Sequence, residues 1–391
     1  MANIDWFNEA RFGMFVHWGA YSGAGRGEWV LNRENIPLEE YTEKYANHFL
    51  AERYDPREWV QLAKKAGMKY IVLTTKHHDG FCLWDTKTTD FNTVNIGPKR
   101  DLVRPFAEAV REAGLKLGFY FSVMDWSHPD YPDPYLLPEW HDEEARRRFV
   151  HFYQSQLEEL LTQYGKVDML WYDGVHPKPM DGERINTWVQ SLQPHILINN
   201  RNGEPCHFGT PEQEIKAAER GQAWESCITL NDNWGYHAGD YNYKSSTDVI
   251  RMLTQVAEGA GNLLLNIGPK ADGTVPDESI AILSEVGQWL ERNGEFLYAS
   301  SRSPFEWNNF GRLTTKGNRV YVHIFHSTGD ELCISEIGNP VLSARVLSTG
   351  QPIPFDQYRT RLFLKQLPAK NNREVLTLVL DVEGPPQSTR M

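Results

Sequence analysis

Cysteine is scarce in this chain of 391 residues, which has only Cys82, Cys206, Cys227 and Cys333. Their scattered spacing predicts neither a disulfide framework nor a zinc knuckle. No apolar run reaches the length of a membrane-spanning helix, so no membrane partner is expected. Basic runs are also lacking, and the net charge of −12 argues against nucleic acid as a partner.

The first residues lack a basic segment followed by an apolar one, so no signal peptide is visible. We therefore expect a cytoplasmic protein with free thiols, although a secreted form whose signal peptide has been removed would look the same. Hydrophobic residues at 40% and charged residues at 24% are ordinary for a globular protein. The length allows one large and one small domain.

Helical and strand-like segments alternate through most of the chain. Residues 55–67 have helical periodicity and end in glycine, an apolar strand follows at 70–75, and 102–121 repeats this unit. Continuously apolar strands indicate a parallel sheet that is buried on both faces. The pattern continues with helices at 143–164, 182–192, 246–258 and 277–293 and with strands that end at 173, 200 and 266.

This alternation predicts a (β/α)8-like, TIM-type catalytic barrel over residues 1–302. A doubly wound sheet is the alternative, but it would usually need a glycine-rich phosphate loop after its first strand, and none is present. From about Ser303 the pattern changes to short strands separated by turn residues. We predict a small antiparallel β-sandwich over residues 303–391, of which 383–391 form a tail.

Polar and aromatic residues gather where the predicted barrel strands end, which is the edge that carries the chemistry in such barrels. The run 167–172 ends at Asp173, a candidate nucleophile, general base or metal ligand, with a helix cap as the structural alternative. Its neighbours Trp171 and Tyr172 would suit stacking on a sugar. Glycoside hydrolysis needs a second carboxylate, roughly 5–5.5 Å away in retaining enzymes.

His77 and His78 invite a metal hypothesis. Metal-binding barrels more often place two histidines on the same face of a strand, whereas these two are adjacent and follow Lys76. Hydrogen bonding to sugar hydroxyls is therefore favoured, with a structural role as the alternative. For His17 and for the pair Glu28 and Trp29, the sequence likewise allows either a ligand-binding role or a structural role.

These motifs together resemble the α-L-fucosidases of glycoside hydrolase family 29. The matching pieces run in the family's order from Trp6 to Ala299, and the ordered set is highly specific. They are Ala10–Gly19, Gly27–Trp29, Thr75–Phe81, Tyr120–Ser122, Trp171–Gly174, Asn200–Arg201, Thr210–Glu212, Trp224–Glu225, Trp234–Tyr236 and Asn262–Pro269.

The resemblance implies a retaining exo-α-L-fucosidase with Asp173 as the nucleophile, and it implies neither a cofactor nor a metal. Glu212 best matches the general acid/base, with Glu225, at the end of an expected strand, and Glu214 as alternatives in that order. The resemblance also implies a fucosylated oligosaccharide or glycoconjugate as substrate. Fucose recognition maps onto His17, Glu28, Trp29, His77, His78, Tyr120, Arg201 and Trp234.

Two other classes stay open, a non-catalytic carbohydrate-binding protein and a metal-dependent hydrolase that uses His77 and His78. A sugar of the same stereochemistry, such as L-galactose, could also fit. The sequence leaves open the linkage preference and the oligomeric state, including a homo-oligomer.

Overall fold

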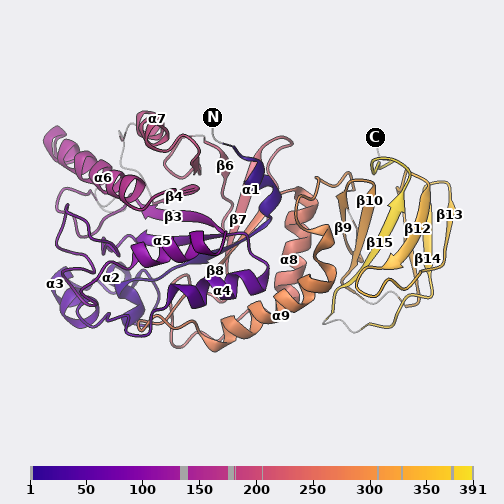
Figure 1. Ribbon diagram of the computed structural model, residues 1–391, viewed down its shortest axis with the longest axis horizontal. Helices are drawn as coiled ribbons and strands as arrows, with labels where there is room; N and C mark the ends of the chain where they lie inside the picture. Colours follow the sequence, from indigo (N-terminus) through magenta and orange to yellow (C-terminus); the bar gives the residue numbers. More distant parts are fainter. Residues whose placement is uncertain are drawn as a thin grey trace.

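Eight parallel strands form a barrel in the computed structural model of the chain (Figure 1). The structure describes residues 3–132, 140–174, 180, 182–204, 206–305, 308–326, 329–370 and 374–389. The order of the strands in the sheet is β5-β4-β3-β2-β1-β8-β7-β6. The strands are β1 (Phe12–Val16), β2 (Tyr70–Lys76), β3 (Lys116–Ser122), β4 (Met169–Asp173), β5 (Leu197–Ile198), β6 (Phe208–Gly209), β7 (Ala223–Thr229) and β8 (Asn262–Ile267).

The barrel is nearly closed where its two shortest strands meet. β5 and β6 have two residues each, and a single parallel bridge between Asn199 and Phe208 joins their ends. The backbone N–H of His207 adds a hydrogen bond of 3.0 Å to the carbonyl of Ile198. The predicted barrel is therefore confirmed, with a distortion at this seam.

Helices cover the outside of the barrel between most strands. No helix follows β5 or β6 within the part of the chain that the structure describes. The connection from β1 to β2 instead carries several short helical segments before α4. The outer helices are α4 (Pro56–Ala66), α5 (Val103–Glu112), α6 (Glu143–Gln163), α7 (Gly182–Leu192), α8 (Ser246–Gly259) and α9 (Asp277–Asn293). The short segments between β1 and α4 are η1 (Ala20–Gly23), α2 (Val30–Arg33), α3 (Leu38–Tyr41) and η2 (Thr42–Ala46), and one more short helix, α1 (Asp5–Ala10), precedes β1.

The helix ends lie close to where local signals predict them. At α4 the side chain of Asp55 accepts a hydrogen bond from the N–H of Arg57, and Pro56 occupies the first turn. Gly67 ends this helix with a φ of 91°, a conformation that suits glycine because it has no Cβ. Ser245 and Asp248 form a reciprocal capping box at the start of α8.

Side chains of the strands divide between two apolar layers. Phe15, Tyr120, Trp171 and Leu264 belong to a cluster inside the barrel, whereas alternate strand residues such as Leu170 pack with the helices. This division follows from the two-residue period of a β-strand. The inner cluster fills the barrel below its carboxyl-terminal edge, so the edge itself is left for polar side chains.

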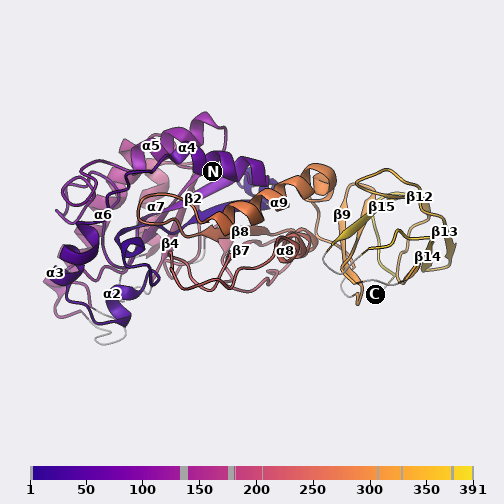
Figure 2. The same cartoon turned by 90° about the horizontal axis from the view of Figure 1, so that it is seen from below.

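The C-terminal part is a sandwich of two antiparallel sheets, as predicted. Its strand orders are β12-β15-β10-β9 and β11-β14-β13, and both views place it at one end of the molecule, beside α8 and α9 (Figure 1, Figure 2). A separate apolar cluster fills it. The strands are β9 (Gly311–Lys316), β10 (Arg319–Ile324), β11 (Glu331–Ile334), β12 (Val341–Val346), β13 (Phe355–Tyr358), β14 (Arg361–Lys365) and β15 (Leu376–Val382), and the short helix η3 (Gly294–Phe296) precedes them.

No apolar run marks β9, whose residues are mostly polar, or β13, in which Asp356 and Gln357 separate two aromatic residues. The predicted tail is wrong for residues 383–389, since Ser388 bridges to Ile337 and the N–H of Thr389 donates to the carbonyl of Glu336. Residues 390–391 lie outside the described part. The division of the chain at residues 302 and 303 stays a prediction. No helix among the described residues is long and apolar enough to cross a bilayer.

Candidate active site

A cavity of about 330 Å³ opens at the carboxyl-terminal edge of the barrel strands. Its wall combines imidazole, indole and charged side chains, and the residues come from the ends of several different strands. Such a mixture of rings and a few polar groups is typical of a site that binds a small ligand. Of the predicted residues, the wall contains His17, Trp29, His77, His78, Tyr120, Asp173, Arg201, Glu212 and Trp234.

Asp173 ends β4 and receives donors on both oxygens. The hydroxyl of Tyr120 donates to its Oδ2 over 2.9 Å, and Nη1 of Arg201 donates to its Oδ1 over 2.9 Å. Burial by itself would raise the pKa of this carboxyl. The charge of Arg201, together with the Tyr120 hydroxyl, outweighs burial, so the pKa is lowered. Asp173 is therefore an ionised carboxylate held rigidly at the cavity.

Arg201 contacts a second carboxylate with its other terminal nitrogen. Its Nη2 lies 2.8 Å from Oε2 of Glu212, whose side chain is 42% exposed. The guanidinium also donates from Nε to the hydroxyl of Thr210 over 2.9 Å and lies 4.8 Å above the ring of Trp171. The guanidinium of Arg201 thus holds both carboxylates at the same cavity, and the side chain of Glu212 is more exposed to solvent than that of Asp173.

The three histidines of the cavity are almost completely buried. Burial lowers the pKa of His17 to about 3 and that of His78 to about 4, and it lowers the pKa of His77 well below its ordinary value. All three rings are therefore neutral near pH 7. His78 Nε2 lies 3.7 Å from Oδ2 of Asp173, a contact between a neutral ring and a carboxylate rather than an ion pair.

The other two glutamate candidates do not reach the cavity wall. Glu225 is the third residue of β7 rather than the end of a strand, and it lies inside the barrel below the cavity. Its carboxyl accepts hydrogen bonds from the hydroxyl of Tyr70 and, over 2.9 Å, from the indole N–H of Trp171. Burial raises its pKa to about 7. Glu214 is exposed and is not part of the wall.

Glu28 also lies behind the cavity instead of on its wall. Its Oε2 accepts a hydrogen bond of 2.8 Å from the N–H of Gly235, next to Trp234. Only 8% of the residue is exposed, and burial raises its pKa. Glu28 therefore holds the segment that carries Trp234, while the adjacent Trp29 lines the cavity.

One sequence interpretation needs correction because strand side chains alternate between the faces of the sheet. Tyr172 does not flank the Asp173 carboxylate in the cavity, since its ring packs against Tyr153 of α6 on the outer face. Trp171 faces inward, lines the cavity as expected and stacks on Tyr120, with ring centroids 5.8 Å apart. The aromatic support below the site thus comes from every second residue.

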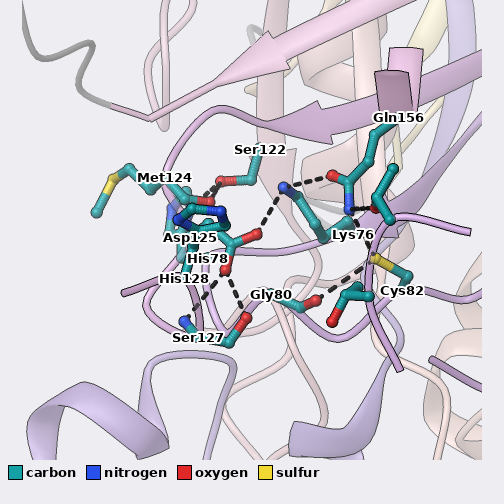
Figure 3. A network of polar contacts seen from close by, with 12 residues as sticks. Lys76, His78, Gly80, Cys82, Ser122, Met124, Asp125, Ser127, His128 and Gln156 are labelled. Atoms are coloured by element: carbon teal, nitrogen blue, oxygen red, sulfur yellow. Dashed lines mark hydrogen bonds and ion pairs between the residues drawn. The ribbon is translucent and has the colours of Figure 1, made fainter. Parts of the chain in front are cut away.

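Lys76 belongs to a separate buried network behind the histidines (Figure 3). Its Nζ lies 2.9 Å from Oδ2 of Asp125 and 2.9 Å from Oε1 of Gln156, and the side chains of Lys76 and Asp125 are fully buried. Its charge is therefore neutralised away from the cavity. Among the residues that the structure describes, no three His, Cys, Asp or Glu side chains converge in an arrangement that could hold a metal ion.

Sequence reasoning missed Phe15, Met124 and Cys227, which also line the cavity. The strand period could have indicated two of them, because Phe15 precedes His17 by two residues and Cys227 follows Glu225 by two. Met124 lies beyond the end of β3, and no periodic signal marks it.

Comparisons with known proteins agree with this geometry. The family model described as Alpha-L-fucosidase matches residues 2–295. Human tissue alpha-L-fucosidase is 32% identical over 359 residues, which cover 82% of this chain and 75% of that protein.

Solved structures are similar over almost the whole chain. Alpha-L-fucosidase isoenzyme 1 from Paenibacillus thiaminolyticus superposes with a TM-score of 0.90 and 38% identity, covering 97% of this chain and 98% of that one. A trapped covalent intermediate of a GH29 alpha-L-fucosidase from Bacteroides thetaiotaomicron gives 0.88 and 29%, covering 97% and 95%. This chain belongs to the α-L-fucosidases of glycoside hydrolase family 29.

Proposed function

We propose that this chain hydrolyses terminal α-L-fucosyl residues from oligosaccharides or glycoconjugates with retention of configuration. Asp173 acts as the nucleophile and Glu212 as the general acid/base. The observation that carries the proposal is the pair of carboxylates bound by Arg201, of which Asp173 is ionised and rigid and Glu212 is exposed. The family membership supports the enzyme class.

In the first step an oxygen of Asp173 attacks the anomeric carbon, and the bond from that carbon to the leaving oxygen breaks. Glu212, in its protonated form, gives its proton to the leaving oxygen. Tyr120 and Arg201 hold the attacking carboxylate in place through their hydrogen bonds. In the second step a water molecule gives a proton to Glu212 and attacks the same carbon, which releases fucose and Asp173.

The remaining wall residues suit the rest of the sugar ring. Neutral imidazoles at His17, His77 and His78 can exchange hydrogen bonds with ring hydroxyls. Trp29 and Trp234 present apolar ring surface to the C–H face and the methyl group of fucose. Because Glu28 lies behind Trp234, its proposed part in recognition is to hold that segment.

The test is hydrolysis of an aryl α-L-fucoside followed by proton NMR of the sugar released first. Double displacement predicts that α-L-fucose appears before mutarotation equilibrates the anomers. Initial release of the β anomer would contradict the nucleophilic role of a carboxylate. Binding of fucosides without any hydrolysis would favour the carbohydrate-binding alternative. A panel of α-1,2, α-1,3, α-1,4 and α-1,6 linked oligosaccharides and an L-galactoside would define the substrate.

A metal-dependent hydrolase through His77 and His78 makes a different prediction. Dialysis against a strong chelator should leave the fucosidase activity unchanged if these rings only bind hydroxyls. Loss of activity that zinc or manganese restores would support the metal alternative.

A further inference from the structure

His78 has a buried partner on the side of its ring that faces away from the sugar site. Its Nδ1 lies 2.6 Å from the hydroxyl oxygen of Ser122, and that oxygen lies 2.8 Å from the carbonyl oxygen of Met124 (Figure 3). Ser122 is fully buried at the end of β3. The family-like run Tyr120–Ser122 therefore contains a residue that has no role in the mechanism above.

The direction of these hydrogen bonds follows from the number of protons available. A carbonyl oxygen only accepts, so the single hydroxyl proton of Ser122 goes to Met124. The Ser122 oxygen must then accept from His78, which places a proton on Nδ1 of the ring. In a neutral imidazole the other nitrogen, Nε2, consequently carries a lone pair.

His17 is oriented in the same way by Asn266 of β8. The Nδ2 group of Asn266 donates to the carbonyl of Trp234 over 2.7 Å, which turns its Oδ1 toward His17. Nδ1 of His17 lies 2.7 Å from that oxygen and must be the donor. Nε2 of His17 is therefore a second lone-pair nitrogen. His17 and His78 both belong to the cavity wall.

The lone pair on His78 has a consequence at the nucleophile. Nε2 of His78 and Oδ2 of Asp173 lie 3.7 Å apart, and in this tautomer neither atom carries a proton. A hydrogen bond between them cannot form, so Oδ2 keeps only its donor from Tyr120. The opposite tautomer would point an N–H at this oxygen and tie up an electron pair that attack on the sugar requires.

We propose that Ser122 and Asn266 are positioning residues that hold His78 and His17 in the tautomer whose Nε2 accepts hydrogen bonds, so that the cavity selects sugars presenting hydroxyl donors. The identity of the donor as a fucosyl hydroxyl rests on the proposed function. The tautomers themselves do not, because they follow from buried contacts within the chain.

The direct test is nitrogen NMR of the protein with ¹⁵N-labelled histidine, assigned with His17→Gln and His78→Gln. Unprotonated Nε2 and protonated Nδ1 at both rings of the wild-type protein near pH 7 are expected. Protonated Nε2 at His78 in the free protein would overturn the assignment of Ser122. The same result at His17 would overturn the assignment of Asn266.

A matched pair of variants isolates the hydroxyl of residue 122. Ser122→Thr keeps the hydroxyl, whereas Ser122→Val has a methyl group in its place. Threonine and valine have the same shape, so both variants crowd the site equally and differ only in the hydroxyl. We expect Ser122→Thr to retain the tautomer and Ser122→Val to lose it. Asn266→Asp and Asn266→Leu provide the corresponding pair for His17. Equal tautomer populations within each pair would contradict a positioning role.

The sugar requirement is tested through competitive inhibition by L-fucose and its 2-, 3- and 4-position deoxy and fluoro analogues. Fluorine can accept but cannot donate a hydrogen bond, so at the hydroxyl that contacts Nε2 the fluoro and deoxy sugars should lose affinity alike, by about 10- to 100-fold. Retention of affinity by all three fluoro sugars would overturn the donor requirement. If L-fucose does not bind while NMR gives the assigned tautomers, the proposed function fails and the positioning of the rings stands.

Discussion

Arg201 connects the two carboxylates that the proposed chemistry uses. Each terminal nitrogen binds a different one, at 2.9 Å to Asp173 and 2.8 Å to Glu212. Bound to the same cation, the two still differ in surroundings, since Asp173 also accepts from Tyr120 and Glu212 is half exposed to solvent. Such a difference suits one carboxylate that attacks and another that gains and loses a proton.

Asp173→Gly should lower hydrolysis of an aryl fucoside by about 1,000-fold or more, because it removes the oxygen that forms the glycosyl-enzyme. The measurement is steady-state kinetics with the folded state checked by circular dichroism. Added azide should restore part of the turnover and yield a β-fucosyl azide, since the small anion can occupy the space left by the carboxylate. Activity near that of the wild type without azide would remove Asp173 from the nucleophilic role.

Glu212→Ala should impair natural oligosaccharides far more than activated aryl fucosides, because a sugar leaving group needs a proton and a nitrophenolate hardly does. The ratio of the two kcat/KM values measures this dependence. Glu214→Ala is the matched control, as it removes an exposed glutamate two residues away. If Glu225→Ala alone produced the leaving-group dependence, Glu225 would be the acid/base despite its burial.

At the scale of elements, the end of β2 connects the cavity with a buried polar network behind it. Its end carries Lys76, which is bound to Asp125 and Gln156 in the fully buried network, and directly after it His77 and His78 line the cavity. Gln156 comes from α6, so this network ties the strand to an outer helix as well as to the loop after β3. The loop also carries Met124 of the cavity wall, so the ion pair anchors the loop at the residue next to that wall.

Asp125→Ala should destabilise the protein by about 3–5 kcal/mol, because it leaves the Lys76 ammonium buried without its counter-charge. Urea unfolding at neutral pH gives the free energy. The double variant Lys76→Met, Asp125→Ala removes both charges and should lose much less stability than the sum of the losses measured for Lys76→Met and Asp125→Ala alone. Strictly additive losses would show that the two charges do not stabilise each other.

At the scale of the whole molecule, the sandwich contacts the barrel through α8, β9 and the short helix η3. His323 of β10 lies at this contact, with its ring 4.4 Å from that of Phe296. Its two ring nitrogens lie 2.9 Å and 3.0 Å from the hydroxyls of Thr314 and Thr377. Burial lowers the pKa of His323 to about 3, so the ring is neutral in the folded protein across the ordinary pH range.

This histidine should make stability fall in acid. Above its unfolded pKa of about 6.5 the ring is neutral in both states, and its contribution does not change with pH. Below that value His323 is protonated in the unfolded chain but stays neutral in the folded protein. The free energy of unfolding therefore falls by about 1.4 kcal/mol per pH unit down to the folded pKa of about 3. His323→Gln should remove this part of the pH dependence.

Urea unfolding at pH 7 and pH 5 measures the effect. Between these values the wild-type protein should lose about 2 kcal/mol more than His323→Gln, whatever the substitution costs at pH 7. An identical pH dependence in both proteins would show that His323 is charged in the folded state or exposed to solvent.

The alternation of helices and strands, the sandwich and the strand-end position of Asp173 are encoded in local patterns. Helical periodicity, glycine after a helix and continuous apolar runs act within about ten residues, and a single chain shows them directly. The same patterns miss β6, β9 and β13, since pairing with neighbours, rather than apolar content, holds these short or polar strands in place.

Tertiary structure alone decided which side chains meet. Sequence placed three glutamates in one stretch, but only the fold puts Glu212 against Arg201, Glu225 inside the barrel and Glu214 in solvent. It likewise pairs Lys76 with a carboxylate 49 residues away and turns Tyr172 from the cavity. The physical reason is that a side chain's direction depends on strand register and on packing with distant segments, and burial then sets its charge state.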